Sequence, residues 1–217
     1  MTTGKEGDTI YTPDNEPYLG RESVFMFDNA IITCLQTNER IAPYTHKIEK
    51  SDLQLAACQI IPQGISIALS IRELIRQGYL FGAFVLTRSL IERATIILYL
   101  HHNPEKVEIW KRGWKHGERP NLAQMLNSIG KGKFPHIGNM VTPRYNSLIH
   151  GDPDSASWNL VKIKDGVVGY GVSKIIDNPS LCDEICLEGI TWLTILISMA
   201  AAIFPDANIV ETKLKKD

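Results

Sequence analysis

The sequence predicts an all-α protein, a helical bundle with one small β-hairpin inserted before its last helix. Apolar residues recur at helical spacing in segments that proline and glycine separate. The segment from Tyr79 to His102 is apolar around almost its whole circumference, as expected for a helix at the centre of a bundle. Asp165-Gly166 lies between two runs of residues that favour strands, and this pattern predicts the hairpin.

Length and composition fit one folded domain. The chain has 217 residues, of which 44% are hydrophobic, so it can bury a sizeable core. Its 23 lysines and arginines nearly balance 24 aspartates and glutamates. This balance excludes a strongly basic protein that coats nucleic acid, but not an enzyme that touches RNA at one basic patch. We expect a flexible tail at residues 1–20, a single domain at residues 21–207 and a polar tail at residues 208–217.

Two helices are predicted before the central one. Apolar positions from residue 21 to residue 36 fit an amphipathic helix, and residues 38–50 look like a connection. Ser51 is a plausible N-cap for a long helix that runs towards Gly78, where the chain can reverse. Pro62 should kink or split this helix, because proline removes one hydrogen bond and clashes with the preceding turn.

The central helix carries few polar residues, and three of them share one face. Arg88, Glu92 and Thr95 have i,i+4 and i,i+7 spacing. Because a buried charge is costly unless it is paired, we expect Arg88 and Glu92 to form an internal ion pair. The alternative is a supporting role in which this pair holds the residues of a functional site.

Shorter helices are predicted after the central one. The first begins at Asn103-Pro104 and extends to about residue 116, and the second covers residues 120–130. Thr142-Pro143 is a strong start signal for a helix of about two turns, which Gly151 and Pro153 should end.

The predicted hairpin pairs residues 158–163 with residues 167–172 across a turn at Lys164-Asp165-Gly166. Ser180 is expected to cap the last long helix, which should extend to about Phe204.

The sequence predicts neither a metal site nor a cofactor. The four cysteines form no C-x-x-C pair, which favours reduced core thiols in a cytoplasmic protein. His101 and His102 are adjacent, so they point in different directions on a helix and make a poor metal clamp. Phosphate-binding glycine loops and the H-E-x-x-H and G-x-S-x-G motifs are absent from the sequence.

One segment, residues 189–205, is uncharged and apolar enough to suggest a membrane helix. It is shorter than the roughly 20 residues that a span requires, and acidic residues precede it. We therefore expect a buried bundle helix without stable membrane insertion. A membrane-associated protein is a weaker alternative that rests on this segment alone.

The segment Arg144-Tyr145-Asn146-Ser147-Leu148-Ile149-His150 is the most informative for function. In this segment the chain resembles the HEPN superfamily of small helical nucleotide-binding and ribonuclease domains. The signature of that superfamily is an arginine followed, after four to six residues, by a histidine. The resemblance extends over about residues 50–204, and it implies a metal-independent endoribonuclease, a toxin or defence effector, with Arg144 and His150 as catalytic residues.

The chemistry suits these residue types. RNA carries its own nucleophile, the 2′-hydroxyl, so cleavage requires a proton-transfer group, which His150 supplies, and a fixed cation, which Arg144 supplies. Asn146 shares a helix face with His150 at i,i+4 spacing and is a candidate supporting residue, as are Arg88 and Glu92.

Assembly and further partners follow from the same motif. Arg144 and His150 lie about 120° apart on a straight helix, so they meet only if the helix frays at His150 or if a partner subunit completes the site. A homodimer with His150 near its two-fold axis is therefore expected, as the resemblance also implies.

Lys131 and Lys133 are weak candidates for phosphate contacts. RNA is the expected substrate and an antitoxin or regulatory protein a further partner. The alternative is a non-catalytic HEPN-like module that binds a nucleotide or a protein.

Overall fold

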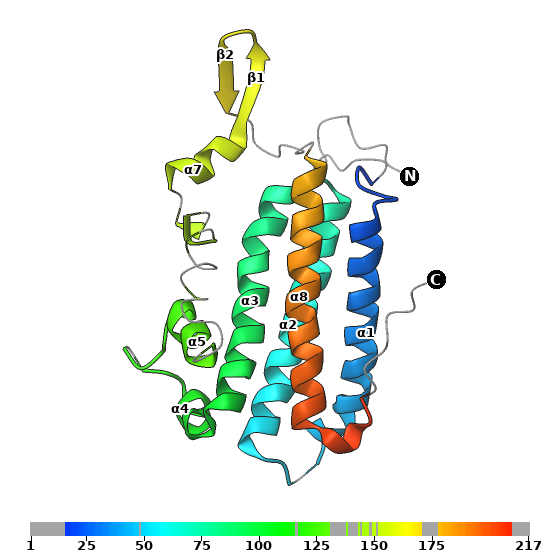
Figure 1. Ribbon diagram of the computed structural model, residues 1–217, viewed down its shortest axis with the longest axis vertical. Coiled ribbons are helices and arrows are strands. Elements are labelled where there is room, and N and C mark those ends of the chain that lie inside the picture. The colour runs from blue at the N-terminus through cyan, green and yellow to red at the C-terminus, as the bar shows by residue number, and fades with distance from the viewer. Residues whose placement is uncertain are drawn as a thin grey trace, which may run out of the picture.

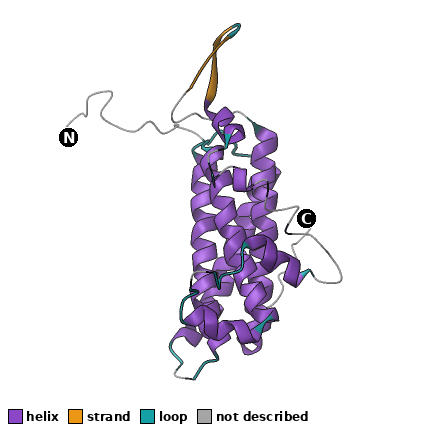
Figure 2. Cartoon of the chain, turned by 90° about the vertical axis from the view of Figure 1, so that its left-hand side faces the viewer, coloured by secondary structure: helices purple, strands orange, loops and turns teal. Residues whose placement is uncertain are grey.

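The protein is an all-α bundle with a small β-hairpin before its last helix, as the sequence predicts (Figures 1 and 2). The structure is a computed structural model. It describes residues 16–47, 49–115, 117–130, 138, 143, 145–147, 149–150, 152–170 and 178–209. The four longest described helices are α1 (Glu22–Thr45), α2 (Asp52–Arg76), α3 (Leu80–His102) and α8 (Pro179–Ile203).

These four helices pack side by side around one core. Both α1 and α3 pack against α2 and α8. Figure 1 shows α1, α3 and α8 running in the same direction and α2 running against them. Leu90, Ile97 and Leu100 on α3 are fully buried, which confirms that α3 is the central helix.

The first helix is longer than predicted. It continues through residues 38–45, which the sequence analysis assigned to a connection, and Pro43 lies in its last turn. At that position proline costs little more than one hydrogen bond, and the burial of Ile41 holds the last turns against the core.

The second helix is continuous where a kink or a split was expected. Ser51 is its N-cap, as predicted, and forms a capping box in which its side chain accepts from the backbone N–H of Gln54 at 3.1 Å. Pro62 lies inside the helix. The neighbouring Ile61 and Ile65 are buried, so packing on both sides of the proline keeps the two halves of α2 in one helix. Gly78 has a φ of +79° and permits the reversal into α3.

The last helix begins at Pro179 and ends at Ile203, close to the predicted end. Its N-cap is Asn178, not Ser180, because the Asn178 side chain accepts a hydrogen bond from the backbone N–H of Leu181 at 3.1 Å. Pro179 then occupies the first helical position, where its missing N–H costs nothing.

Between α3 and α8 the chain forms only short elements. They are the 3₁₀ helix η1 (Pro104–Lys106), α4 (Val107–Lys111), α5 (Leu122–Ile129), α7 (Pro153–Ala156) and η2 (Ser157–Asn159). In Figure 1, α4, α5, α7 and the hairpin follow one another along the outer side of α3. The helix expected over residues 103–116 therefore ends early, at Lys111, and a new helix begins at Pro153, where the preceding one was expected to stop.

The hairpin confirms the predicted turn at Asp165-Gly166, but Lys164 belongs to the first strand, and residues 158–159 belong to η2. Strands β1 (Leu160–Lys164) and β2 (Val167–Tyr170) are antiparallel, and Leu160 pairs with Tyr170 and Lys162 with Val168. Gly166 adopts a φ of +75°, which explains the glycine at that turn position. The register shifts between Lys162 and Lys164.

Both ends of the described chain lie against the bundle. Tyr18 is buried although it belongs to the predicted tail, and Glu16 accepts a hydrogen bond from Arg72 at 3.0 Å. After α8 the chain forms η3 (Pro205–Ala207), and Ile209 packs against the core. The rest of the predicted tails, residues 1–15 and 210–217, lies outside the described residues.

Two described helices, α2 and α8, are long and apolar enough to cross a membrane by length and composition. The sequence analysis noted only the second. About 44% of the most apolar window of each helix is buried within the bundle. A core helix passes the same test, so this observation is weak evidence for a span.

An acid-sensitive contact joins the start of α1 to α8. Arg21 and Ser23 donate hydrogen bonds to Asp183, the Arg21 Nε atom at 2.8 Å, and these bonds lower the pKa of the Asp183 carboxyl. A carboxyl whose pKa is lowered by folding stabilises the protein above its ordinary pKa, and this contribution is lost as the pH falls towards the lowered value. The Asp183→Asn variant should therefore lose less stability than the wild type when the pH falls from neutral to about 3. Urea midpoints at the two pH values measure this.

The matched control for that substitution is Asp206→Asn, at an exposed carboxylate in η3 that forms no ion pair among the described residues. We expect its acid sensitivity to equal that of the wild type. Equal acid sensitivity of Asp183→Asn and the wild type would contradict a stabilising role for the Arg21–Asp183 contact.

Candidate functional site

The motif segment is a helical turn that packs against α3. Of the residues from 143 to 149, those the structure describes (143, 145–147 and 149) are helical, as predicted from Thr142-Pro143. The backbone N–H of His150 donates to the carbonyl of Asn146 at 3.0 Å, so the helical turn reaches the histidine. Arg144, Lys131 and Lys133 lie outside the described residues.

Tyr145 anchors this segment. It is 1% exposed, and its ring lies 5.2 Å from the ring of Phe84 on α3 in an edge-to-face arrangement. Trp158 in η2 packs against the same Phe84 ring at 5.8 Å and against Phe81 at 5.9 Å. Aromatic residues that precede and follow His150 in the sequence both contact Phe84, so they fix the segment to one face of α3.

The outer side of the segment presents the predicted catalytic histidine together with Asn146, the candidate supporting residue. Asn146 and His150 are both exposed, and their i,i+4 spacing places them on one face. Ile149, beside the histidine, is also exposed. An imidazole in this position can reach a bound molecule without any rearrangement of the core.

Arg88 and Glu92 form the predicted ion pair on α3. Arg88 Nη1 lies 3.1 Å from Glu92 Oε1, and the two side chains are 11% and 26% exposed. Arg119 approaches the same carboxylate oxygen at 3.5 Å. Among the described residues, the buried Nε and Nη1 atoms of Arg88 have no hydrogen-bond partner, so the ion pair with Glu92 is the main compensation for the charge of Arg88.

The structure brings the candidate residues together in two pairs. Arg88 lies one helical turn from Phe84, the residue on which the motif segment is seated. Among the described residues, however, neither Arg88 nor Glu92 forms a hydrogen bond or an ion pair with Asn146 or His150. A supporting role of the α3 pair in a site at His150 therefore stays a prediction.

The described part of the chain offers little support for a metal site or a cysteine nucleophile. It holds no group of three or more histidine, cysteine, aspartate or glutamate residues that could bind a metal ion. The four cysteines are free, and burial raises the pKa of the Cys34 thiol to about 12, so this thiol is a poor nucleophile.

Comparisons with known proteins give one match of unknown function. A family model described as "Family of unknown function (DUF5677)" matches residues 54–133, which contain most of α2 together with α3, η1, α4 and α5. The matched region ends before the motif segment. No curated protein and no solved structure matches the chain. The function must therefore be argued from the residues of the chain itself.

The ion pair on α3 leads to a testable prediction of stability. Glu92→Ala removes the principal partner of a nearly buried arginine, so we expect the free energy of unfolding to fall by about 1–3 kcal/mol. Replacing both residues by apolar ones should recover much of this loss, because no charge is then left unpaired. Chemical denaturation of the three proteins measures both effects.

The exposed pair of Glu73 and Arg76 on α2 provides a matched control, since these residues also lie within one helical turn of each other. Glu73→Ala should change stability little, because an exposed pair is well solvated in both states. If the loss of stability in the double variant equals the sum of the losses from Glu92→Ala and from an Arg88 substitution, the two residues do not interact.

Proposed function

We propose that the protein is a metal-independent endoribonuclease of HEPN type. The observation that carries the proposal is the exposed pair of Asn146 and His150 on the outer face of a helical turn whose inner face is fixed by Tyr145. A proton-transfer group must be accessible to RNA and yet held in place, and His150 meets both requirements.

The proposed reaction is a transesterification within the RNA. The 2′-oxygen attacks the adjacent phosphorus and loses its proton, the bond from phosphorus to the 5′-oxygen breaks, and the leaving 5′-oxygen gains a proton. His150 transfers one of these protons, and Arg144 stabilises the additional negative charge on the phosphate oxygens. The products carry a 2′,3′-cyclic phosphate and a 5′-hydroxyl.

The site is proposed to form between two copies of the chain. Arg144 and His150 are separated by about 120° around a helix, so motif segments that face each other across a two-fold axis supply the missing group to one another. A cytoplasmic toxin or defence effector that is held inactive by a neutralising protein is the proposed biological setting.

Incubation of the pure protein with mixed RNA tests this function directly. The expected result is cleavage that excess EDTA does not slow, products with a 2′,3′-cyclic phosphate, and no cleavage of DNA. DNA lacks the 2′-hydroxyl, so its degradation would exclude the proposed mechanism. No cleavage of any RNA would instead favour the non-catalytic module that binds a nucleotide or a protein.

A further inference from the structure

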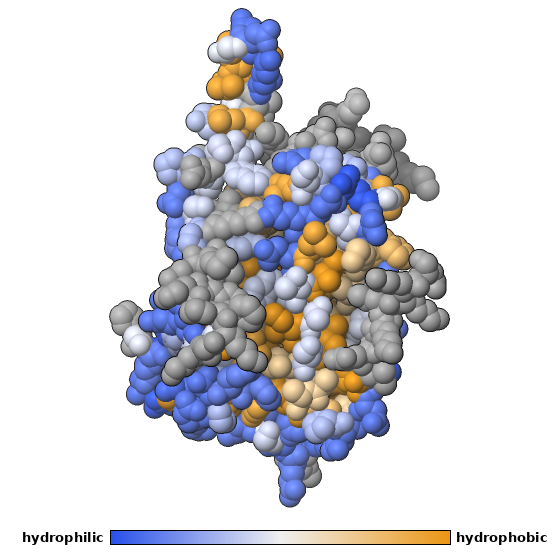
Figure 3. Space-filling view, viewed as in Figure 1, coloured by the Kyte–Doolittle hydropathy of each residue, from blue (hydrophilic) through white to orange (hydrophobic). Residues whose placement is uncertain are grey.

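The β-hairpin exposes apolar side chains far from the core. Figures 1 and 2 show it standing clear of the helices, and Figure 3 shows apolar residues on its surface. Ile163, Val168 and Tyr170 are 67%, 64% and 79% exposed. A two-stranded hairpin is at best marginally stable in water unless another element covers it. This hairpin is therefore suited to binding a second surface.

Charge and apolar residues are combined on the hairpin. After the register shift Lys164 pairs with Val167, so these two residues share one face of the hairpin. The side chain of Ile163 lies against Gly169, on the same face as Val167. Lys164, next to the turn, is exposed and forms no hydrogen bond or ion pair among the described residues. The surface that this hairpin fits should therefore be apolar with at least one available carboxylate.

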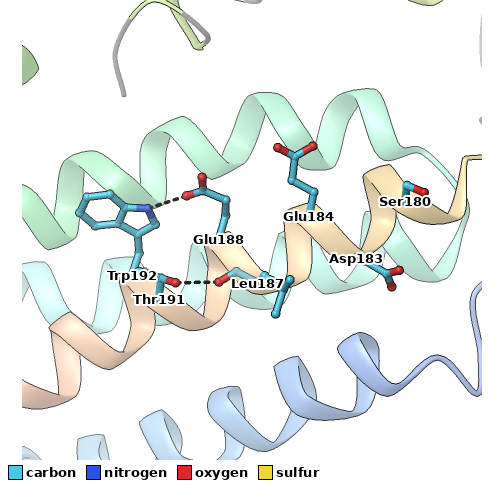
Figure 4. Close-up of a pocket in the computed structure, with 7 residues that line it drawn as sticks. All are labelled: Ser180, Asp183, Glu184, Leu187, Glu188, Thr191 and Trp192. Atoms are coloured by element: carbon cyan, nitrogen blue, oxygen red, sulfur yellow. Dashed lines mark hydrogen bonds between the residues drawn. The ribbon is translucent and has the colours of Figure 1, made fainter. Parts of the chain in front are cut away.

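The outer face of α8 has these properties. A shallow depression of about 500 Å³ runs along it. Its lining residues are Ser180, Asp183, Glu184, Leu187, Glu188, Thr191 and Trp192. Leu187 is 51% exposed. Figure 4 shows Glu184 and Glu188 projecting to the same side of the helix.

Glu188 is the available carboxylate. It accepts a hydrogen bond from Trp192 Nε1 at 3.0 Å, but no lysine or arginine of the described chain pairs with it. Asp183, which also lines the depression, is already paired with Arg21. Within the described residues, a half-buried glutamate without a cationic partner and an exposed lysine without an anionic partner thus occur on two different surfaces.

We propose that the hairpin of one copy of this chain docks on the outer face of α8 of a second copy, and that the exchange is mutual. Ile163 and Val167 then cover Leu187, and Lys164 pairs with Glu188 of the other copy. A two-fold axis repeats each contact, so a modest complementary surface is used twice. These contacts and the facing motif segments of the proposed site share one two-fold axis in this proposal, so both belong to the same dimer. The interface does not rest on the ribonuclease activity, and its test measures association alone.

Charge reversal on either surface should separate the copies. At concentrations of tens of micromolar we expect the wild type to be a dimer in light scattering. Lys164→Glu and Glu188→Lys, each alone, should weaken association by at least about tenfold, because each places like charges in contact at both ends of the interface. Lys115→Glu, at an exposed lysine outside both surfaces, is the matched control and should leave the dimer intact.

An equimolar mixture of Lys164→Glu and Glu188→Lys distinguishes exchange between copies from other arrangements. The first variant keeps Glu188 and the second keeps Lys164, so a mixed dimer joins opposite charges at both contacts. We expect this mixture to dimerise, which also shows that both variants are folded. A monomeric wild type, single variants that dimerise like the wild type, or a mixture that stays monomeric would each overturn the proposal. The last result would point to docking within one chain or on a different protein.

Discussion

Replacing His150 by alanine should reduce the rate of RNA cleavage by about 10²–10⁴-fold, the usual contribution of general acid–base catalysis. The side chain is exposed, and the residue that seats the segment on α3 is the neighbouring Tyr145. The melting temperature and the helix content of the variant should therefore match those of the wild type. Cleavage rates of purified proteins on one RNA, together with circular dichroism, measure the two properties separately.

His46 provides a matched control for this substitution, because it is also an exposed histidine at the end of a helix, in this case the C-cap of α1. His46→Ala removes the same chemical group from a comparable position, so it should leave the cleavage rate unchanged. If cleavage survives in His150→Ala, the activity resides in another part of the molecule or in a contaminant. If both variants lose activity equally, the loss has a general cause and not a catalytic one.

The fold was predictable where local pattern and burial agree. The apolar circumference of α3, the Ser51 cap and the Asp165-Gly166 turn each specify their element from a few neighbouring residues. The positions of Pro43 and Pro62 were misjudged because the local penalty of proline was taken as decisive. Burial of neighbouring isoleucines outweighs one missing hydrogen bond, and that packing is a property of the assembled bundle.

The candidate site was predictable only as a set of residue types. The ion pair of Arg88 and Glu92 follows from i,i+4 spacing on one helix. The anchoring role of Tyr145 depends on Phe84, which lies in another helix and far away in the sequence. The contact between Arg21 and Asp183 is likewise a long-range feature, and no spacing rule identifies it.

Leu90 offers the most direct test of the bundle itself. It is fully buried at the middle of α3, and α3 packs against α2, α8 and α5. Leu90→Ala should lower the free energy of unfolding by about 2–5 kcal/mol, because the apolar burial is lost and the surrounding helices close the resulting cavity only in part.

The same substitution at Leu69 on α2 is the matched control, since this leucine is 46% exposed. Leu69→Ala changes the same atoms in a helix of similar length without leaving an enclosed cavity, so its cost should stay below about 1 kcal/mol. Urea denaturation of both variants measures the difference. Because α3 packs between α2 and α8, the free energy of unfolding should fall more in Leu90→Ala than in Leu69→Ala. Equal and small losses at the two positions would place α3 at the edge of the bundle, and the surface on which Tyr145 holds His150 would then no longer be a rigid one.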